Sequence, residues 1–166
     1  MDDAPGRHHS LLLDQLTEER AKKGSLEQRG IAIISTSGTL VAIVLGFVAL
    51  ATRNPAFVPP ATVVTLMIVA LCGLVVAAAA GLLVNAPTRM PVIDAQELLA
   101  IVEQPDWDRI DAAGRRAEYR LQAELLVEVR RVNRWRARVL LAGLLVEVSA
   151  LGLMAVSAVL VLRPLV

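Results

Sequence analysis

The run from Val139 to Leu162 constrains the fold most, because it is apolar along its whole length except for two serines and one acid, Glu147. A helix of this length rises about 36 Å, which is enough to cross a bilayer core of roughly 30 Å. Glu147 falls in the inner half of the run, where a charged side chain costs roughly 2.5–3.5 kcal/mol on insertion scales. The run therefore predicts a membrane-spanning helix whose acid needs a partner, a proton or a water-filled cavity.

Two more runs of spanning length, 31–51 and 61–84, hold almost no charge. Hydrophobic residues make up 55% of the chain and its mean hydropathy is +0.58, so the apolar content exceeds that of an ordinary soluble domain. These runs predict an all-α integral membrane protein with three transmembrane helices. The expected parts are a tail and amphipathic helix at 1–30, a transmembrane hairpin at 31–84, a cytoplasmic helical region at 85–138 and the third transmembrane helix at 139–166.

The positive charges predict the orientation. Lysines and arginines precede the first run, Arg53 alone lies between the first two runs, ten arginines lie between the second and third, and Arg163 alone follows. The positive-inside rule then gives a cytoplasmic N-terminus and an outside C-terminus in the plasma (inner) membrane. The first run is too long for the apolar core of a signal peptide, and no small-residue cleavage site follows it.

The polar regions also have helical patterns. Leu11–Lys23 predicts a short amphipathic helix with Leu12, Leu13 and Leu16 on one face. Gly24 is suited to end that helix, and the capping box from Ser25 to Gln28 predicts that a new helix begins at Leu26. A further amphipathic helix is expected at Asp94–Glu103, and from about Trp107 the pattern stays helical as far as the membrane.

A polar cluster in the first run matches Glu147 in depth. Ser35–Thr39 lie about 8–14 Å from the cytoplasmic start of their helix, and Glu147 lies roughly 13 Å from the start of its own. We therefore expect Glu147 to be accommodated by the hydroxyl groups of Thr36, Ser37 or Thr39, within one subunit or across an oligomer. On the second run the same depth is occupied by Ala77–Ala80, whose small side chains leave room.

Small residues recur at every fourth position in the first two runs, and such stripes allow helix backbones to approach closely. Because the connecting loop is short and rich in proline, we expect these two runs to pack as a tight hairpin through their stripes. The stripe residues are Gly38, Ala42 and Gly46 in the first run and Gly73, Ala77 and Gly81 in the second.

Basic and aromatic residues gather just before the third run. Arg130, Arg134 and Arg138 are spaced four apart and Trp135 lies among them, which is the composition that anionic headgroups and the membrane interface select. We expect these four residues to anchor the helix at the headgroups, either as a general topology anchor or by binding a specific lipid.

The sequence contains no pattern typical of catalysis. It lacks a phosphate-binding glycine loop, a zinc-ligand pair and a nucleophile with a nearby base, and its two histidines, His8 and His9, lie in the tail. Cys72 is alone and predicts a packing residue, and no basic–aromatic platform for nucleic acid exists. We expect no enzyme activity, no cofactor, no metal and no nucleic-acid partner.

Three functions remain open. The chain is a structural or interaction protein whose helices share a buried polar junction, a homo-oligomeric pore lined by Glu147 and hydroxyl groups, or a membrane-anchored adaptor or sensor with a cytoplasmic protein partner. A pore requires a homo-oligomer, because three helices are too few to enclose a channel.

Residues 19–30 (ERAKKGSLEQRG) and the following Thr36-Ser-Gly38 resemble a group of uncharacterised small integral membrane proteins of actinobacteria, over most of the chain. That resemblance implies no activity. The arrangement of a cytoplasmic helix, a two-span hairpin and another cytoplasmic helix is similar to that of SLATT domains, which are predicted pore-forming effectors of bacterial nucleotide-signalled defence systems. This chain adds a third span and shares no SLATT motif residue, so the similarity implies no site residues.

Overall fold

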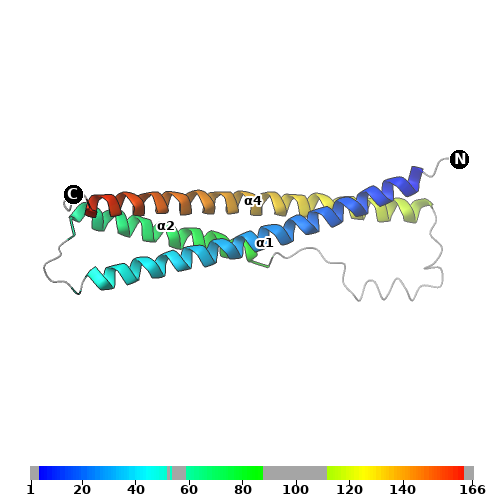
Figure 1. Cartoon of the computed structure of the whole chain (residues 1–166). Helices are drawn as coiled ribbons and strands as arrows, with labels where there is room; N and C mark the ends of the chain where they lie inside the picture. The colour runs from blue at the N-terminus through cyan, green and yellow to red at the C-terminus, as the bar shows by residue number, and fades with distance from the viewer. Residues whose placement is uncertain (1–3, 52, 54–58, 88–111, 163–166) are drawn as a thin grey trace. The chain divides into compact units, whose positions relative to one another are not determined.

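The structure, a computed structural model, describes residues 4–51, 53, 59–87 and 112–162. These residues form three helices, α1 (Ala4–Ala51), α2 (Ala61–Asn85) and α4 (Ala112–Leu162) (Figure 1). Each helix is long and apolar enough to cross a membrane, with mean hydropathies of 2.3, 2.7 and 2.3 in the most apolar windows. For the described residues, the prediction of an all-helical fold with three such helices is confirmed. The amphipathic helix predicted at Asp94–Glu103 lies outside the described residues.

Prolines set both ends of α2. The helix begins after Pro60, whose carbonyl oxygen accepts hydrogen bonds from the backbone amides of Val63 at 2.9 Å and Val64 at 3.2 Å. It ends at Asn85, and Ala86 adopts an extended conformation because a residue before proline is disfavoured from the helical region. The predicted stop at Asn85-Ala-Pro87 is confirmed.

The predicted break at Gly24 is wrong, because α1 continues through this residue. A glycine that ends a helix usually adopts positive φ, and no described glycine does so. An internal glycine costs a helix only about 1 kcal/mol, which the good helix formers on both sides outweigh. The capping box from Ser25 to Gln28 therefore lies inside a helix and starts none.

The chain divides into two compact units. The first, here called the polar unit, contains the described residues up to Lys22 together with Pro87 and the part of α4 up to Val132. The second, the apolar unit, contains Lys23–Ala86 and α4 from Asn133 onward. Each unit therefore contains part of α1 and part of α4.

Ion pairs join the two helices of the polar unit. Arg130 of α4 lies 3.4 Å from the carboxylate of Glu19 of α1, which is buried, and its guanidinium also donates to Gln15. Lys22 pairs with Glu18 at 3.0 Å and Glu19 at 3.3 Å, and the hydrogen bonds that its ammonium group donates to these carboxylates raise the pKa of Lys22. Leu12 and Leu16 are half-buried, whereas Leu13, which was expected on the same face, is exposed.

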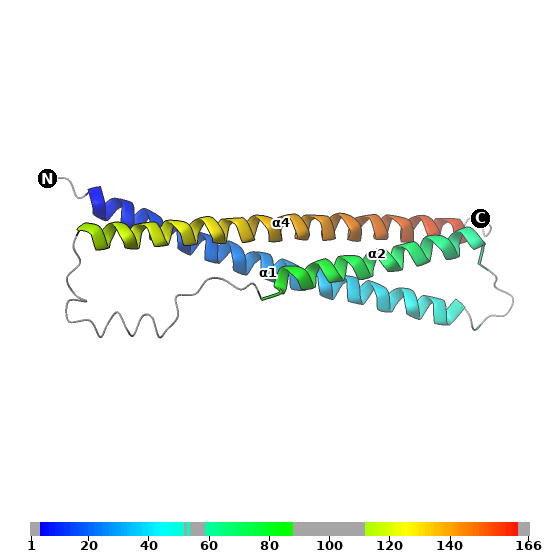
Figure 2. The same ribbon diagram turned by 180° about the vertical axis from the view of Figure 1, so that it is seen from behind.

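In the apolar unit, α1 and α4 run in the same direction and α2 runs opposite to both (Figures 1 and 2). One stripe of α2 is buried along its whole length, at spacings of three, four and seven residues that keep it on a single helix face. This stripe consists of Val63, Ala70, Leu74, Ala77, Gly81 and Val84. Most large side chains elsewhere on the three helices point outward, as expected of helices surrounded by lipid.

Glycines permit the closest approaches between these helices. A Cβ on Gly81 of α2 would lie 2.7 Å from the carbonyl oxygen of Gly30 in α1, so the two backbones nearly touch. A Cβ on Gly73 would lie 3.2 Å from that of Ala150, and one on Gly143 would lie 2.9 Å from that of Ala80. The small residues of α2 therefore face both neighbouring helices.

The small-residue stripe of α1 does not take part in this packing. Nothing lies within 4 Å of a Cβ built on Gly38 or Gly46, and Ala42 is exposed. The predicted use of these three residues between α1 and α2 is wrong. The face of α1 that packs inward instead carries Gly30, Ile33, Ser37 and Val44, and the helix period places the expected stripe on a different side.

Candidate functional site

Glu147 lies in α4 with only 6% of its surface exposed. The Thr36 hydroxyl oxygen lies 2.6 Å from Oε1 of this carboxyl group, and the Ser37 hydroxyl lies 3.1 Å from the same oxygen. Ser37 is completely buried. The structure thus brings Glu147 together with two of the three hydroxyl residues that the depth comparison selected.

The third, Thr39, lies away from this junction. Its hydroxyl donates to the carbonyl oxygen of Ser35 at 2.9 Å, and the side chain is exposed. Two residues along a helix correspond to a rotation of about 200°, so Ser37 and Thr39 cannot both face α4. Depth alone does not distinguish these positions, whereas the helix face does.

Small residues of α2 lie against α4 one turn before Glu147. Ala77 is completely buried, and a Cβ on Gly143, one turn before Glu147, would lie 3.6 Å from the carbonyl oxygen of Ala77. The sequence predicted that Ala77–Ala80 leave room at this depth, and α4 approaches α2 closely there. Cys72, which was expected to pack, is exposed.

A second buried contact was missed at the sequence level. Arg136 of α4 is 1% exposed, and its Nη1 donates to Glu27 of α1 at 2.7 Å. Its Nη2 donates to the carbonyl oxygen of Ala86, which is the C-cap residue of α2, at 3.0 Å. A helix C-terminus carries unsatisfied carbonyl groups and partial negative charge, so the guanidinium finds a favourable partner there as well as on Glu27.

The sequence contains a signal for Arg136. Counting back from Glu147, Gly143, Leu140 and Arg136 follow at spacings of four, three and four, which keep all of them on one helix face. All four are buried. The spacing from Glu147 could therefore have predicted that Arg136 lies on the buried face of α4.

The four expected headgroup anchors divide into two groups. Arg130 faces α1 in the polar unit through its contacts with Glu19 and Gln15. Arg134, Trp135 and Arg138 are exposed in the apolar unit. Exposure is compatible with headgroup contact for these three, and their role at the membrane stays a prediction.

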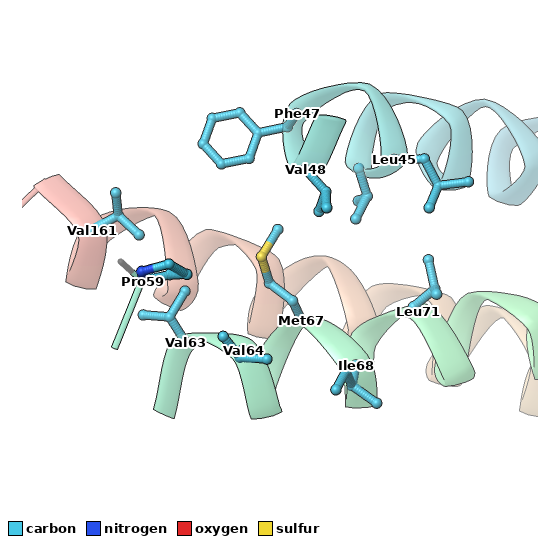
Figure 3. Close-up of a pocket in the computed structure, with 11 residues that line it drawn as sticks. Leu45, Phe47, Val48, Pro59, Val63, Val64, Met67, Ile68, Leu71 and Val161 are labelled. Atoms are coloured by element: carbon cyan, nitrogen blue, oxygen red, sulfur yellow. The ribbon is translucent and has the colours of Figure 1, made fainter. Parts of the chain in front are cut away.

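Two cavities of about 340 and 270 Å³ lie where the last turns of α1 face the first turns of α2 and the end of α4. Figure 3 shows the larger cavity, with Phe47 and Val48 of α1 opposite Met67 of α2 and with Val161 of α4 at one end. Both linings are apolar apart from Ser157, whose hydroxyl donates to the carbonyl oxygen of Leu153. Among the described residues, no group of three potential metal ligands occurs.

No family model, curated protein or solved structure matches the chain. The resemblances to small actinobacterial membrane proteins and to SLATT domains therefore stay predictions.

Proposed function

We propose that this chain is a multi-pass protein of the plasma membrane that acts structurally or by protein interaction, with its N-terminus in the cytoplasm and its C-terminus outside. Three apolar helices support the membrane location. The orientation rests on the positive charges, which concentrate before the first span and between the second and third.

The observation that carries the proposal is that the two buried ionisable side chains described in the apolar unit, Arg136 and Glu147, contact other helices of the same chain. Glu147 contacts two hydroxyl groups of α1, and Arg136 binds both α1 and the end of α2. Each residue thus makes polar contacts with another helix of the same chain. A pore would instead need such groups to face water.

Reconstitution into liposomes tests this function. We expect proton and potassium fluxes no greater than those of empty liposomes, and no difference between wild type and Glu147→Gln. A flux that falls in Glu147→Gln, from a detergent particle whose mass corresponds to several copies, would overturn the proposal in favour of a homo-oligomeric pore.

Crosslinking in native membranes separates the structural form of the proposal from the adaptor form. A photoreactive residue at Val127, which is exposed in the polar unit, reports on what covers that helix. A single defined protein adduct supports an adaptor with a cytoplasmic partner, whereas an absence of protein adducts supports a purely structural role. The same probe at exposed Val148 of α4 is the matched control, since lipid is its expected neighbour.

A further inference from the structure

Several hydroxyl groups within the described helices make the same type of hydrogen bond. The hydroxyl groups of five residues each donate to the carbonyl oxygen four residues earlier, at 2.8–3.0 Å. These residues are Thr17, Thr39, Thr65, Ser149 and Ser157. This bond is the usual way in which a helical serine or threonine satisfies its hydroxyl group in an apolar setting.

The Thr36 hydroxyl can make the same bond to a carbonyl oxygen of its own helix, and it also contacts Glu147. Its Oγ1 lies 3.0 Å from the carbonyl oxygen of Ala32 and 3.1 Å from that of Ile33, in addition to the 2.6 Å contact with Glu147 Oε1. A hydroxyl group carries one proton and two acceptor lone pairs. If the Thr36 proton is directed to the carbonyl groups, as in the other five residues, the short contact to Glu147 needs a proton from the carboxyl group.

The electrostatic surroundings favour the same proton position. The segment of α1 that faces Glu147, from Gly30 to Ala49, carries no ionisable side chain, and α2 carries only Cys72, which is exposed. On α4 the nearest cations are Arg138 and Arg136, nine and eleven positions before Glu147, and Arg136 already binds Glu27. An ionised carboxylate would therefore be buried without a counter-charge, which is the costliest state for such a group in an apolar environment.

We propose that Glu147 is a proton-binding site within the membrane. Its carboxylate takes one proton from water as the helices assemble and becomes a neutral acid. Oε1–H donates to Thr36 Oγ1, the Thr36 hydroxyl donates to the carbonyl oxygen of Ala32, and the Ser37 hydroxyl donates to Oε1. Every proton then has an acceptor, and no net charge is buried. The inference rests on the proposed function, because it describes how the junction between α1 and α4 is kept neutral.

Infrared spectroscopy of the full chain in lipid bilayers at neutral pH tests the site. Wild type should show the carbonyl-stretch band of a protonated carboxyl group, and Glu147→Gln should lose it. Glu124→Gln is the matched control, because Glu124 lies exposed on the same helix and should leave the band unchanged. Glu19 is buried too, but its pairing with Arg130 and Lys22 favours the ionised form, so it should not contribute.

Thr36 variants then locate the proton. Thr36→Val should move the band to higher wavenumber, because the acid loses its acceptor, whereas Thr36→Ser should leave it in place. Labelling the glutamates of wild type with ¹³C should move the band to lower wavenumber, which shows that the group is a glutamate, and the loss of the band in Glu147→Gln then assigns it to Glu147. The inference is overturned if wild type shows only ionised carboxylates at neutral pH. That result would leave the liposome test of function unaffected, because an ionised Glu147 can still accept hydrogen bonds from both hydroxyl groups.

Discussion

Glu147 and Arg136 lie eleven positions apart on the same face of α4, roughly 16 Å along the helix. Both are buried ionisable side chains, and each is stabilised in a different way. Arg136 keeps its charge, because Glu27 supplies a carboxylate at 2.7 Å and the end of α2 supplies a carbonyl oxygen. The polar contacts of Glu147 within the described residues are with neutral hydroxyl groups, those of Thr36 and Ser37. The first contact is an ion pair and the second, by our proposal, a chain of neutral hydrogen bonds.

The difference between the two contacts reflects which polar partners are available at each level of the helix bundle. Arg136 lies where α2 ends, so backbone carbonyl groups are free to accept, and Glu27 is one-third exposed and can keep contact with water. Glu147 lies where all three helices continue and their carbonyl groups are already used within each helix. A buried side chain can therefore stay charged at the level of Arg136, whereas at the level of Glu147 the surroundings accommodate only a neutral polar group. The two contacts should respond very differently to substitution.

The largest effect is expected from Glu27→Ala. This variant leaves the Arg136 guanidinium buried without its carboxylate, and breaking a buried pair in this way costs about 3 kcal/mol of stability. Denaturant-dependent unfolding in mixed micelles measures the loss. Glu124→Ala, at an exposed position of α4, should change stability by less than about 0.5 kcal/mol. Equal stability of both variants would show that the ion pair contributes nothing.

The next largest effect concerns the glycine contact between the levels of Arg136 and Glu147. Gly81→Ala forces a Cβ to 2.7 Å from the carbonyl oxygen of Gly30, and the resulting displacement of α1 should cost about 1–3 kcal/mol. Gly38→Ala is the matched control, because nothing lies within 4 Å of its Cβ. It should be neutral or stabilising by up to about 1 kcal/mol, since alanine is the better helix former. The same unfolding assay compares them, and a destabilised Gly38→Ala would indicate that another copy of the chain covers this face.

Glu147→Gln should have a smaller effect than either of these, below about 1 kcal/mol. Glutamine keeps the shape and can both donate and accept, so it replaces a neutral acid with little loss. Interhelical hydrogen bonds in membranes average only about 0.6 kcal/mol in measured cycles. Unfolding in mixed micelles again gives the value. A loss comparable to that of Glu27→Ala would mean that Glu147 is charged, and would remove the contrast with Arg136.

The three helices and the contact of Glu147 with α1 were predictable from the sequence. The helices follow from the length of the apolar runs, and the contact follows from the depth of its residues in the membrane. Three apolar runs give three helices, and the proline after Ala86 gives the end of α2. Equal depth in two helices that run in the same direction brought Glu147 to Thr36 and Ser37. These expectations needed only the rise per residue, the position of the proline and the distribution of positive charge.

The failures concern rotation about the helix axis and local signals. Small residues at Gly38, Ala42 and Gly46 suggested a packing face, but the buried face of α1 is the one that carries Gly30 and Ser37. Arg136 was grouped with its arginine neighbours by composition, although its spacing from Glu147 places it inside. The glycine at 24 indicated a helix end, yet one residue's propensity is too weak to end a helix that continues on both sides.

The smallest effect separates Thr36 from Thr39 and depends on helix face alone. Thr36→Val removes the hydroxyl group that contacts Glu147 and should cost about 0.6 kcal/mol, the average for an interhelical hydrogen bond in a membrane. Thr39→Val is the matched control. Its hydroxyl bonds only within α1, and valine has the same shape, so its stability should stay within experimental error. The double variant with Glu147→Gln should then show coupling for Thr36 and none for Thr39. Coupling at Thr39 instead would place that face of α1 against Glu147 of a second copy, and the junction would belong to an oligomer.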